Sequence, residues 1–314
     1  MSGAKGVRTA VREEQGGSAE GKSRGCCGDD CCGGSAKDVH TVVAEAKHES
    51  AEVKPDADVR AVVREKYGAI AEKGGSCCDE GTGCGCGCVT EALDSIGYTR
   101  DQMAAIPEGA NLGLGCGNPL AYASARPGET VLDLGSGAGI DCFLAAREVG
   151  PTGRVIGVDM TPAMIEKARA NAAKGGYANV EFRLGEIEHL PVADASVDLV
   201  ISNCVINLSP DKPRVFREVF RALKPGGRIV VSDLVLTRPL PPQLKQRVDL
   251  LVGCVAGASL KDDYLRLMRE AGFEGVEIAA ESGYEVGIES LTQDRAEREA
   301  FTTVRSVKVR ATRP

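Results

Sequence analysis

Residues 130–149 read TVLDLGSGAGIDCFLAAREV. TVLDLG predicts a buried strand, and the apolar spacing in GAGIDCFLAAREV predicts a helix. Between them lie Gly135, Gly137 and Gly139, in a GxGxG spacing. Glycines placed directly after a strand and at the start of a helix let the backbone approach a ligand closely and direct helix N–H groups at it. We therefore expect a ligand at this turn.

Strands and helices continue to alternate up to about residue 280. Four further segments predict strands: RVIGVDM (154–160), VEFRLGE (180–186), DLVISNCVINL (198–208) and GRIVVSDLVL (227–236). Helical patterns lie between the first two of these, in TPAMIEKARANAAK, and between the last two, in KPRVFREVFRALK. Strands connected by helices of this length are typical of parallel βαβ units with helices on both faces of the sheet. The predicted fold class is therefore α/β, with a doubly wound, mostly parallel sheet.

The chain divides into four segments by composition and pattern. Residues 1–57 are rich in glycine and cysteine, and we expect a largely disordered, mobile arm. Residues 58–122 begin with VRAVVREKYGAIAEK, an amphipathic helix by its apolar spacing, and continue into a cysteine loop. Residues 123–238 form the predicted cofactor-binding domain. Residues 239–314 add substrate-binding helices, QLKQRVDLLVGC and LKDDYLRLMREAGF, and a closing alternation, VRSVKVRATR, that suits an edge strand.

Composition narrows the functional classes. With 43% hydrophobic and 26% charged residues, the 314-residue chain can bury at least one sizeable core. A net charge of -7 and an aromatic content of 4%, with no Trp, argue against a nucleic-acid partner. No apolar stretch approaches the roughly 18 residues that a membrane helix needs, and the first residues lack a secretory apolar segment. We expect a cytoplasmic monomer without a membrane or nucleic-acid partner.

The glycine turn is more typical of S-adenosylmethionine than of a dinucleotide. A dinucleotide fingerprint would have its third glycine at position 140, which is Ile140. Asp159 ends the next strand, where a carboxylate can accept both ribose hydroxyls. Glu186 follows the third strand and would flank the adenine, a solvated side chain being the alternative. The expected cofactor contacts are Asp133, Gly135, Gly137, Gly139, Asp159, Met160, Glu186, Ile187 and Asn203.

Thirteen cysteines are the unusual feature of the composition. Because a reducing cytosol disfavours permanent disulfides, the candidate uses are thiolate chemistry, binding of a soft metal or metalloid, and packing. Cys116 precedes the first strand, Cys204 ends the fourth, and Cys254 lies on a helix after the fifth. Ligands bind beyond the carboxyl ends of such strands. The wide spacing fits no zinc motif, whereas three thiolates suit a soft pyramidal centre such as arsenite. Taken singly, Cys204 and Cys254 would be packing residues, as we expect for Cys142.

Five segments carry a family resemblance: GLGCGNP (113–119), LDLGSGAGIDC (132–142), GVDMT (157–161), SNCVINLSPDK (202–212) and GCVAGA (253–258). Over roughly residues 60–280 the chain resembles arsenite methyltransferases that depend on S-adenosylmethionine. The resemblance implies a Rossmann-like class I methyltransferase fold with a C-terminal arsenic-binding extension. It also implies methyl transfer to trivalent arsenic, taken up as arsenite or its thiol conjugates and bound by Cys116, Cys204 and Cys254.

The same resemblance implies a fourth thiol, in the loop before the first strand, that pairs reversibly with Cys116 during turnover. That position falls on Cys77 or Cys78, and either residue fits. Thioredoxin or glutathione would then be the external reductant. The chain departs from the family pattern in seven further cysteines, whose role stays open: Cys26, Cys27, Cys31, Cys32, Cys84, Cys86 and Cys88.

Two other functions fit parts of the sequence. A small-molecule C- or O-methyltransferase would use the glycine turn and keep the cysteines as core residues. A thiol-rich metalloid-binding protein would use the cysteines without turnover, although the intact cofactor motif disfavours it. Methyl transfer that requires arsenite would indicate an arsenite methyltransferase, and methyl transfer without arsenite would indicate a small-molecule methyltransferase. Arsenite binding without methyl transfer would indicate a metalloid-binding protein.

Overall fold

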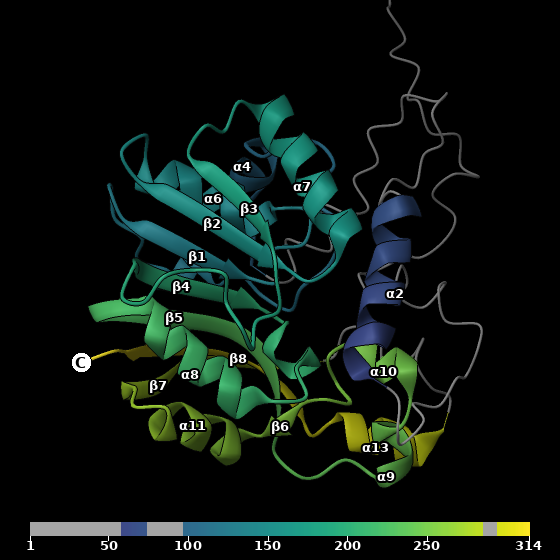
Figure 1. Cartoon of the computed structure of the whole chain (residues 1–314). Coiled ribbons are helices and arrows are strands. Elements are labelled where there is room, and N and C mark those ends of the chain that lie inside the picture. The colour runs from purple at the N-terminus through teal and green to yellow at the C-terminus, as the bar shows by residue number, and fades with distance from the viewer. Residues whose placement is uncertain (1–57, 74–96, 285–293) are drawn as a thin grey trace, which may run out of the picture.

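The computed structural model describes residues 58–73, 97–284 and 294–314 (Figure 1). The expected arm (1–57) and the whole of the expected cysteine loop, GGSCCDEGTGCGCGCV (74–89), lie outside these residues. The described part of the chain forms an eight-stranded sheet with helices on both faces. Its strand order is β3-β2-β1-β4-β5-β8-β7, and β6 pairs with β5 beside this path.

Five neighbouring strands of the sheet run parallel. They are β1 (Thr130–Leu134), β2 (Arg154–Asp159), β3 (Val180–Leu184), β4 (Val197–Asn203) and β5 (Leu223–Leu236). β8 (Val304–Thr312) pairs antiparallel with β5, and β7 (Glu274–Gly283) pairs antiparallel with β8. The short β6 (Ser259–Leu260) runs parallel to β5. The predicted doubly wound, mostly parallel sheet is confirmed.

Helices cover the two faces of the sheet in separate groups. One face carries α5 (Leu120–Ala123), α6 (Ile140–Val149) and α7 (Pro162–Gly175), and the other carries α8 (Lys212–Ala222) and α11 (Lys261–Glu270). The remaining described helices are α2 (Val59–Lys73), α4 (Arg100–Ala104), the 3-10 turn η1 (Ile206–Leu208), α9 (Pro242–Lys245), α10 (Val248–Val252) and α13 (Arg295–Phe301). Of these, α2 packs against α7, α10 and η1 and confirms the helix expected there.

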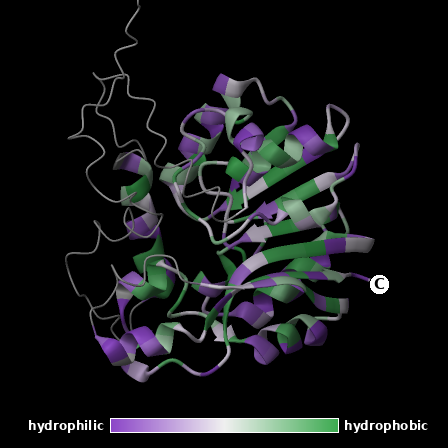
Figure 2. Cartoon of the chain, turned by 180° about the vertical axis from the view of Figure 1, so that it is seen from behind, coloured by the Kyte–Doolittle hydropathy of each residue, from purple (hydrophilic) through white to green (hydrophobic). Residues whose placement is uncertain are grey.

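Alternation along the strands places apolar side chains on both faces. On β1, Leu132 and Leu134 join the core beneath α8 and α11, whereas Val131 joins the core beneath α6 and α7. Successive side chains of a strand point to opposite faces, so a strand covered on both sides is apolar nearly throughout. Figure 2 shows the resulting hydrophobic band along the central strands.

The predicted helix QLKQRVDLLVGC is wrong as a single element. It is divided into α9 and α10, and Cys254 lies beyond the end of α10 with a φ of 63°. The N–H of Gly253 closes the last turn of α10 on the carbonyl groups of Asp249 and Leu251. A left-handed residue directly after such a turn leads the chain out of the helix.

The prediction that VRSVKVRATR is an edge strand is also wrong. β8 lies between β5 and β7, so β7 is the edge. The reason is burial on both faces of β8: Val307 and Val309 are buried on one side, and Ser306 and Lys308 are buried on the other. A strand with two buried faces fits the interior of a sheet.

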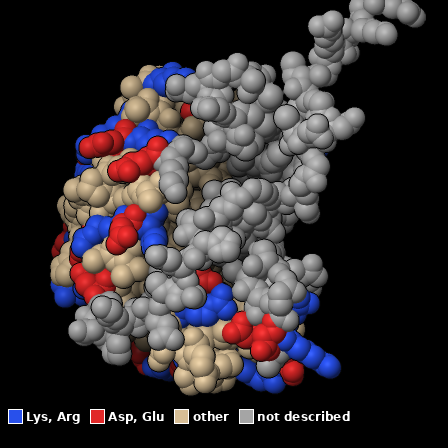
Figure 3. All heavy atoms as spheres, turned by 90° about the vertical axis from the view of Figure 1, so that its right-hand side faces the viewer, with Lys and Arg blue, Asp and Glu red and all other residues tan. Residues whose placement is uncertain are grey.

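Two further observations concern the surface and the helices. Among the described residues, none of the helices is both long and apolar enough to cross a membrane. On the face in Figure 3, acidic and basic side chains of the described residues are interleaved rather than gathered in blocks of one sign.

Candidate active site

A cavity lies at the carboxyl ends of β1, β2 and β4, and α2 lines one side of it through Arg60, Val63 and Tyr67. Most of the predicted cofactor contacts line the same cavity: Asp133, Gly135, Gly137, Asp159, Met160, Ile187 and Asn203. Cys204 and Cys254 line it as well. The fold thus brings the predicted cofactor turn and two of the predicted arsenic ligands to one cavity.

Two predicted cofactor contacts do not line the cavity. Gly139 begins α6 with a φ of 102°, and a Cβ on this residue would lie 2.7 Å from the ring of Phe143. Glu186 accepts hydrogen bonds from Arg60 (3.0 Å) and Arg64 (3.4 Å), which join α2 to the loop after β3. Contact of either residue with a cofactor stays a prediction.

Glu188 lines the cavity, although sequence reasoning did not single it out. The side chain is 3% exposed and accepts a hydrogen bond from the Ser209 hydroxyl at 2.5 Å. The Arg60 guanidinium lies 3.7 Å from its carboxylate. The sequence offered only a second acid two positions after Glu186, and because both acids lie in the turn after β3, strand alternation gave no signal for which of them lines the cavity.

The glycine turn has the geometry expected of a ligand loop. Gly135 has a φ of 66°, and a Cβ on it would lie 2.4 Å from Cγ2 of Val205. Gly137 has a φ of 52°, and its N–H donates to Oδ2 of Asp159 at 3.0 Å. The buried hydroxyl of Ser136 has no hydrogen-bond partner among the described residues. A buried hydroxyl without a partner fits a site that receives a polar ligand.

Three carboxyl groups face this turn: Asp133 and Asp141 are buried, and Asp159 is half-buried. Burial raises the pKa of Asp159 and raises the pKa of Asp141 to about 6. Burial and the neighbouring Asp141 together raise the pKa of Asp133 well above its usual range. No Lys or Arg of the described residues forms an ion pair with any of the three. Burial disfavours the ionised form of these carboxyl groups, and a nearby positive charge favours it. A cationic ligand would therefore bind favourably beside them.

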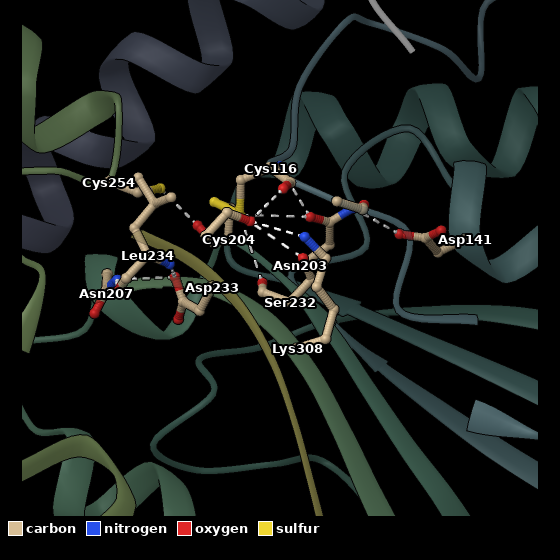
Figure 4. Close-up of a disulfide and its surroundings, with 12 residues drawn as sticks. Cys116, Asp141, Asn203, Cys204, Asn207, Ser232, Asp233, Leu234, Cys254 and Lys308 are labelled. Atoms are coloured by element: carbon tan, nitrogen blue, oxygen red, sulfur yellow. Dashed lines mark hydrogen bonds between the residues drawn. A yellow bond between two sulfur atoms is a disulfide. The ribbon is translucent and has the colours of Figure 1, made fainter. Parts of the chain in front are cut away.

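Two of the three predicted arsenic ligands, Cys116 and Cys204, lie together at the next part of the same edge, and Cys254 lies beside them with its sulfur outside their group (Figure 4). Cys116 and Cys204 form a disulfide, and the Cys254 thiol donates to the carbonyl of Cys204 at 2.6 Å. Burial raises the pKa of the Cys254 thiol well above its usual range. Cys204 has a φ of 57° and Cys254 a φ of 63°. Non-glycine residues seldom adopt this backbone, which is enriched at functional sites.

The partner of Cys116 differs from the expected one. The sequence analysis paired Cys116 with Cys77 or Cys78, whereas the structure bonds it to Cys204. Cys77 and Cys78 lie outside the described residues, so their exchange with Cys116 stays a prediction. Cys142 is fully buried on α6 and donates to Asp133 at 3.2 Å, in keeping with the packing role expected of it.

Asp233 is a second residue that the sequence analysis missed. A carboxylate oxygen lies within 4.8 Å of the sulfur atoms of both Cys116 and Cys204. Burial raises the pKa of this carboxyl to about 7. Asn207 donates to it at 2.8 Å and Tyr264 at 3.1 Å. Its position beside the sulfur atoms results from strand packing, so the local sequence carries no signal for it.

The site and the sheet define the class of the protein. A family model described as a methyltransferase domain matches residues 125–272. Together with the glycine turn after β1 and the acid that ends β2, this match gives the chain the Rossmann-like fold of class I methyltransferases, a class whose cofactor is S-adenosylmethionine.

Comparison with known proteins narrows the class to one family. The arsenite methyltransferase of Halobacterium salinarum is 56% identical over 252 residues, which are 78% of this chain and 62% of the relative. That of Aquipseudomonas alcaligenes is 46% identical over 51% of this chain and 47% of the relative. The crystal structure of an arsenic(III) S-adenosylmethionine methyltransferase from Chlamydomonas reinhardtii superposes with a TM-score of 0.55 at 38% identity, over 71% of this chain and 72% of that chain.

The chain therefore belongs to the arsenite methyltransferase family. It spans less than two thirds of the length of each of the two curated relatives, 62% of one and 47% of the other.

Proposed function

We propose that the chain transfers methyl groups from S-adenosylmethionine to trivalent arsenic held by cysteine thiolates, which would detoxify arsenic. The observation that carries the proposal is that Cys204 and Cys254 line the same cavity as the glycine turn. The arsenic substrates named for the relatives support it. Arsenite or a thiol conjugate of it would be the form taken up.

The cofactor end of the cavity fits its ligand through a few side chains. S-adenosylmethionine would supply an electrophilic methyl group there. Asp159 presents its carboxylate at the end of β2, where it suits the ribose hydroxyls, and Asp133 and Asp141 provide negative charge for a cationic ligand. Val63 and Tyr67 of α2 add an apolar and aromatic wall on one side of the cavity.

The thiol end of the cavity would hold the substrate. Cys204 and Cys254 bind arsenic, and Cys116 is the third ligand before the first transfer. Three neutral thiols condense with arsenous acid to give the trithiolate and three water molecules, so the raised pKa of Cys254 does not prevent binding. Arsenic carries its own lone pair and needs no general base. Catalysis then rests on positioning, with the reacting atoms about 3–3.5 Å apart and in line.

Turnover requires thiols as reductants. Methylation formally oxidises As(III) to As(V), and two thiolates return it to As(III) by forming one disulfide. We assign this step to Cys116 and Cys204, because these two residues are already within bonding distance. Exchange with Cys77 or Cys78 would release Cys204, and thioredoxin or glutathione would reduce the final disulfide.

Arsenic speciation tests the proposal directly. The reduced full-length protein is incubated with arsenite, methyl-labelled S-adenosylmethionine and glutathione, and the arsenic species are separated by chromatography. We expect labelled methylarsenicals, whose ratio also gives the number of methyl groups added. Label that enters another acceptor equally well without arsenite would support a small-molecule methyltransferase. Arsenite retained on the protein without methyl transfer would support a metalloid-binding protein.

The remaining expectations concern the state of the protein in the cell. We infer a cytoplasmic monomer from the composition and the cysteine content. Size-exclusion chromatography with light scattering tests the monomer, and a dimer that persists on dilution would contradict it.

A further inference from the structure

Asn203 lies between the cofactor end and the thiol end of the cavity (Figure 4). It is the last residue of β4 and directly precedes Cys204. Figure 4 shows its amide between the Cys116 loop and Asp141. The side chain is therefore placed to contact both halves of the site.

On the thiol side, the amide of Asn203 holds the backbone around Cys116. Its Oδ1 accepts the N–H of Cys116 at 3.1 Å, and its Nδ2 donates to the carbonyl of Gly117 at 2.6 Å. A Cβ on Gly115 would lie 2.9 Å from Nδ2, so glycine is needed for the loop to approach this closely. The loop is thus packed directly against the amide.

On the cofactor side, the same amide joins a buried network. The second hydrogen of Nδ2 is shared between Oδ2 of Asp141, at 3.2 Å, and the Tyr98 hydroxyl, at 2.9 Å. The Tyr98 hydroxyl donates to Oδ1 of Asp141 at 2.8 Å. Asp141 lines the cofactor cavity. A ligand that fixes the Asp141 carboxylate also fixes the Asn203 amide.

A second contact holds the same loop without touching the cofactor side. The Ser306 hydroxyl, on β8, donates to the carbonyl of Cys116 at 2.9 Å and accepts from Lys308 at 2.8 Å. Ser306 does not line the cofactor cavity. It therefore provides a matched control: a buried residue that holds Cys116 by one hydrogen bond, outside the network of Asp141.

We propose that Asn203 is a positioning residue that couples occupancy of the cofactor cavity to the placement of Cys116 against Cys204. The coupling rests on the proposed function, in which the cavity holds S-adenosylmethionine and Cys116 acts on arsenic. Coupling between two sites is reciprocal, so cofactor binding should favour the approach of Cys116 to Cys204 as much as that approach favours cofactor binding. Cofactor binding would in this way complete the thiol end of the site.

The coupling is measurable without arsenic. Full-length protein is equilibrated in glutathione redox buffers with and without saturating S-adenosylhomocysteine, and the Cys116–Cys204 cross-link is quantified by peptide mass mapping. Each equilibrium constant compares the disulfide plus two glutathiones with two thiols plus glutathione disulfide. In the parent protein we expect the ligand to raise the constant for disulfide formation at least about fivefold, the lower end of typical coupling between sites.

Two variants distinguish coupling between the cofactor cavity and Cys116 from simple support of the loop around Cys116. Asn203→Ala should remove the ligand dependence, so that the two constants become equal. Ser306→Ala should lower both constants and keep their ratio. Should Asn203→Ala fail to fold, Asn203→Asp is the second variant of this residue. It keeps the side-chain volume and the acceptor for the Cys116 N–H but loses the donors to Gly117 and Asp141. The ratio of its constants with and without ligand should also fall to one.

Two results would overturn the inference: a parent protein with no ligand dependence, or a folded Asn203 variant that keeps the parental ratio. Calorimetric titration with S-adenosylhomocysteine confirms saturation in every variant. Because the readout contains no arsenic, failure here is distinct from failure of the speciation experiment, which alone decides whether arsenic is methylated.

Discussion

The two ends of the cavity are built in different ways. The cofactor end is formed by residues that are close in sequence. A hydrogen bond from Gly137, in the turn after β1, to Asp159, the last residue of β2, spans 22 positions. The thiol end joins Cys116 to Cys204 across 88 positions, and Cys204 to Cys254 across 50. The first end is formed by a local motif, and the second exists only when the whole sheet has folded.

This difference has a chemical counterpart. The cofactor end consists of backbone N–H groups and carboxylates, which bind polar ligands without changing their own bonds. The thiol end consists of soft, redox-active sulfur, and it contains the Cys116–Cys204 disulfide, which thiol reductants can convert to two thiols. Variants should therefore separate cofactor binding from arsenic chemistry.

Removing one sulfur should have the largest effect. Cys204→Ser or Cys254→Ser should lower arsenite methylation about 100-fold or more, because misplacement of a reacting atom alone can cost that factor. Under reducing conditions, in which the parent also lacks the Cys116–Cys204 disulfide, affinity for S-adenosylmethionine should stay at the parental value, since neither thiol belongs to the glycine turn. Cys142→Ser is the matched control, a buried cysteine outside the cavity whose replacement by serine keeps a donor for Asp133. Methylation rates and calorimetric affinities check the separation, and survival of activity in both variants would contradict the ligand assignment.

A change at the cofactor end should weaken cofactor binding and leave arsenite binding unchanged. Asp159→Ala should weaken S-adenosylmethionine binding about 10- to 100-fold, because hydrogen bonds to charged groups contribute about 1.5–3 kcal/mol. Binding of arsenite to the reduced protein, measured by tryptic mass mapping of protected thiols, should not change. Glu181→Ala, on neighbouring β3 and outside the cavity, serves as the control. A parental cofactor affinity in Asp159→Ala would remove this carboxylate from the cofactor site.

The same contrast explains what the sequence could predict. The alternation of strands and helices and the glycine turn follow from periodicity and local motif, which is why the fold class and the cavity-lining positions of Gly135 and Asp159 could be predicted. The placement of Asp233 beside the sulfur atoms follows from packing between β4, β5 and β8, which no local pattern encodes. The left-handed backbone of Cys204 and Cys254 was equally hidden, because residue type signals that conformation only for glycine and a few polar residues.

The pH dependence of cofactor binding should sharpen the contrast further. Burial raises the pKa of Asp141 to about 6, and the pKa of Asp133 is raised well above its usual range. A cationic ligand favours the ionised carboxylates, so its affinity should rise with pH and fall as these groups become protonated. For Asp141 alone, the decrease between pH 7 and pH 5 should be about tenfold.

Calorimetric titration with S-adenosylmethionine from pH 5 to pH 8 measures this dependence, and Asp141→Asn should reduce its slope. The neutral thioether S-adenosylhomocysteine should show a weaker dependence, because it lacks the sulfonium charge. Equal slopes for both ligands would show that the carboxylates do not respond to that charge.

The last expected effect is that of Asp233, and it concerns stability rather than binding or activity. Burial raises its pKa in the folded protein to about 7, above the value of about 3.9 in an unfolded chain. Between these values the folded state binds more protons than the unfolded state, so this group makes the free energy of unfolding decrease as pH rises from about 4 to about 7. Asp233→Asn keeps an acceptor for Asn207 and removes the charge. The variant should therefore lose less stability than the parent between pH 5 and pH 8 in denaturant unfolding under reducing conditions, whereas equal losses would mean that the folded protein does not hold this proton.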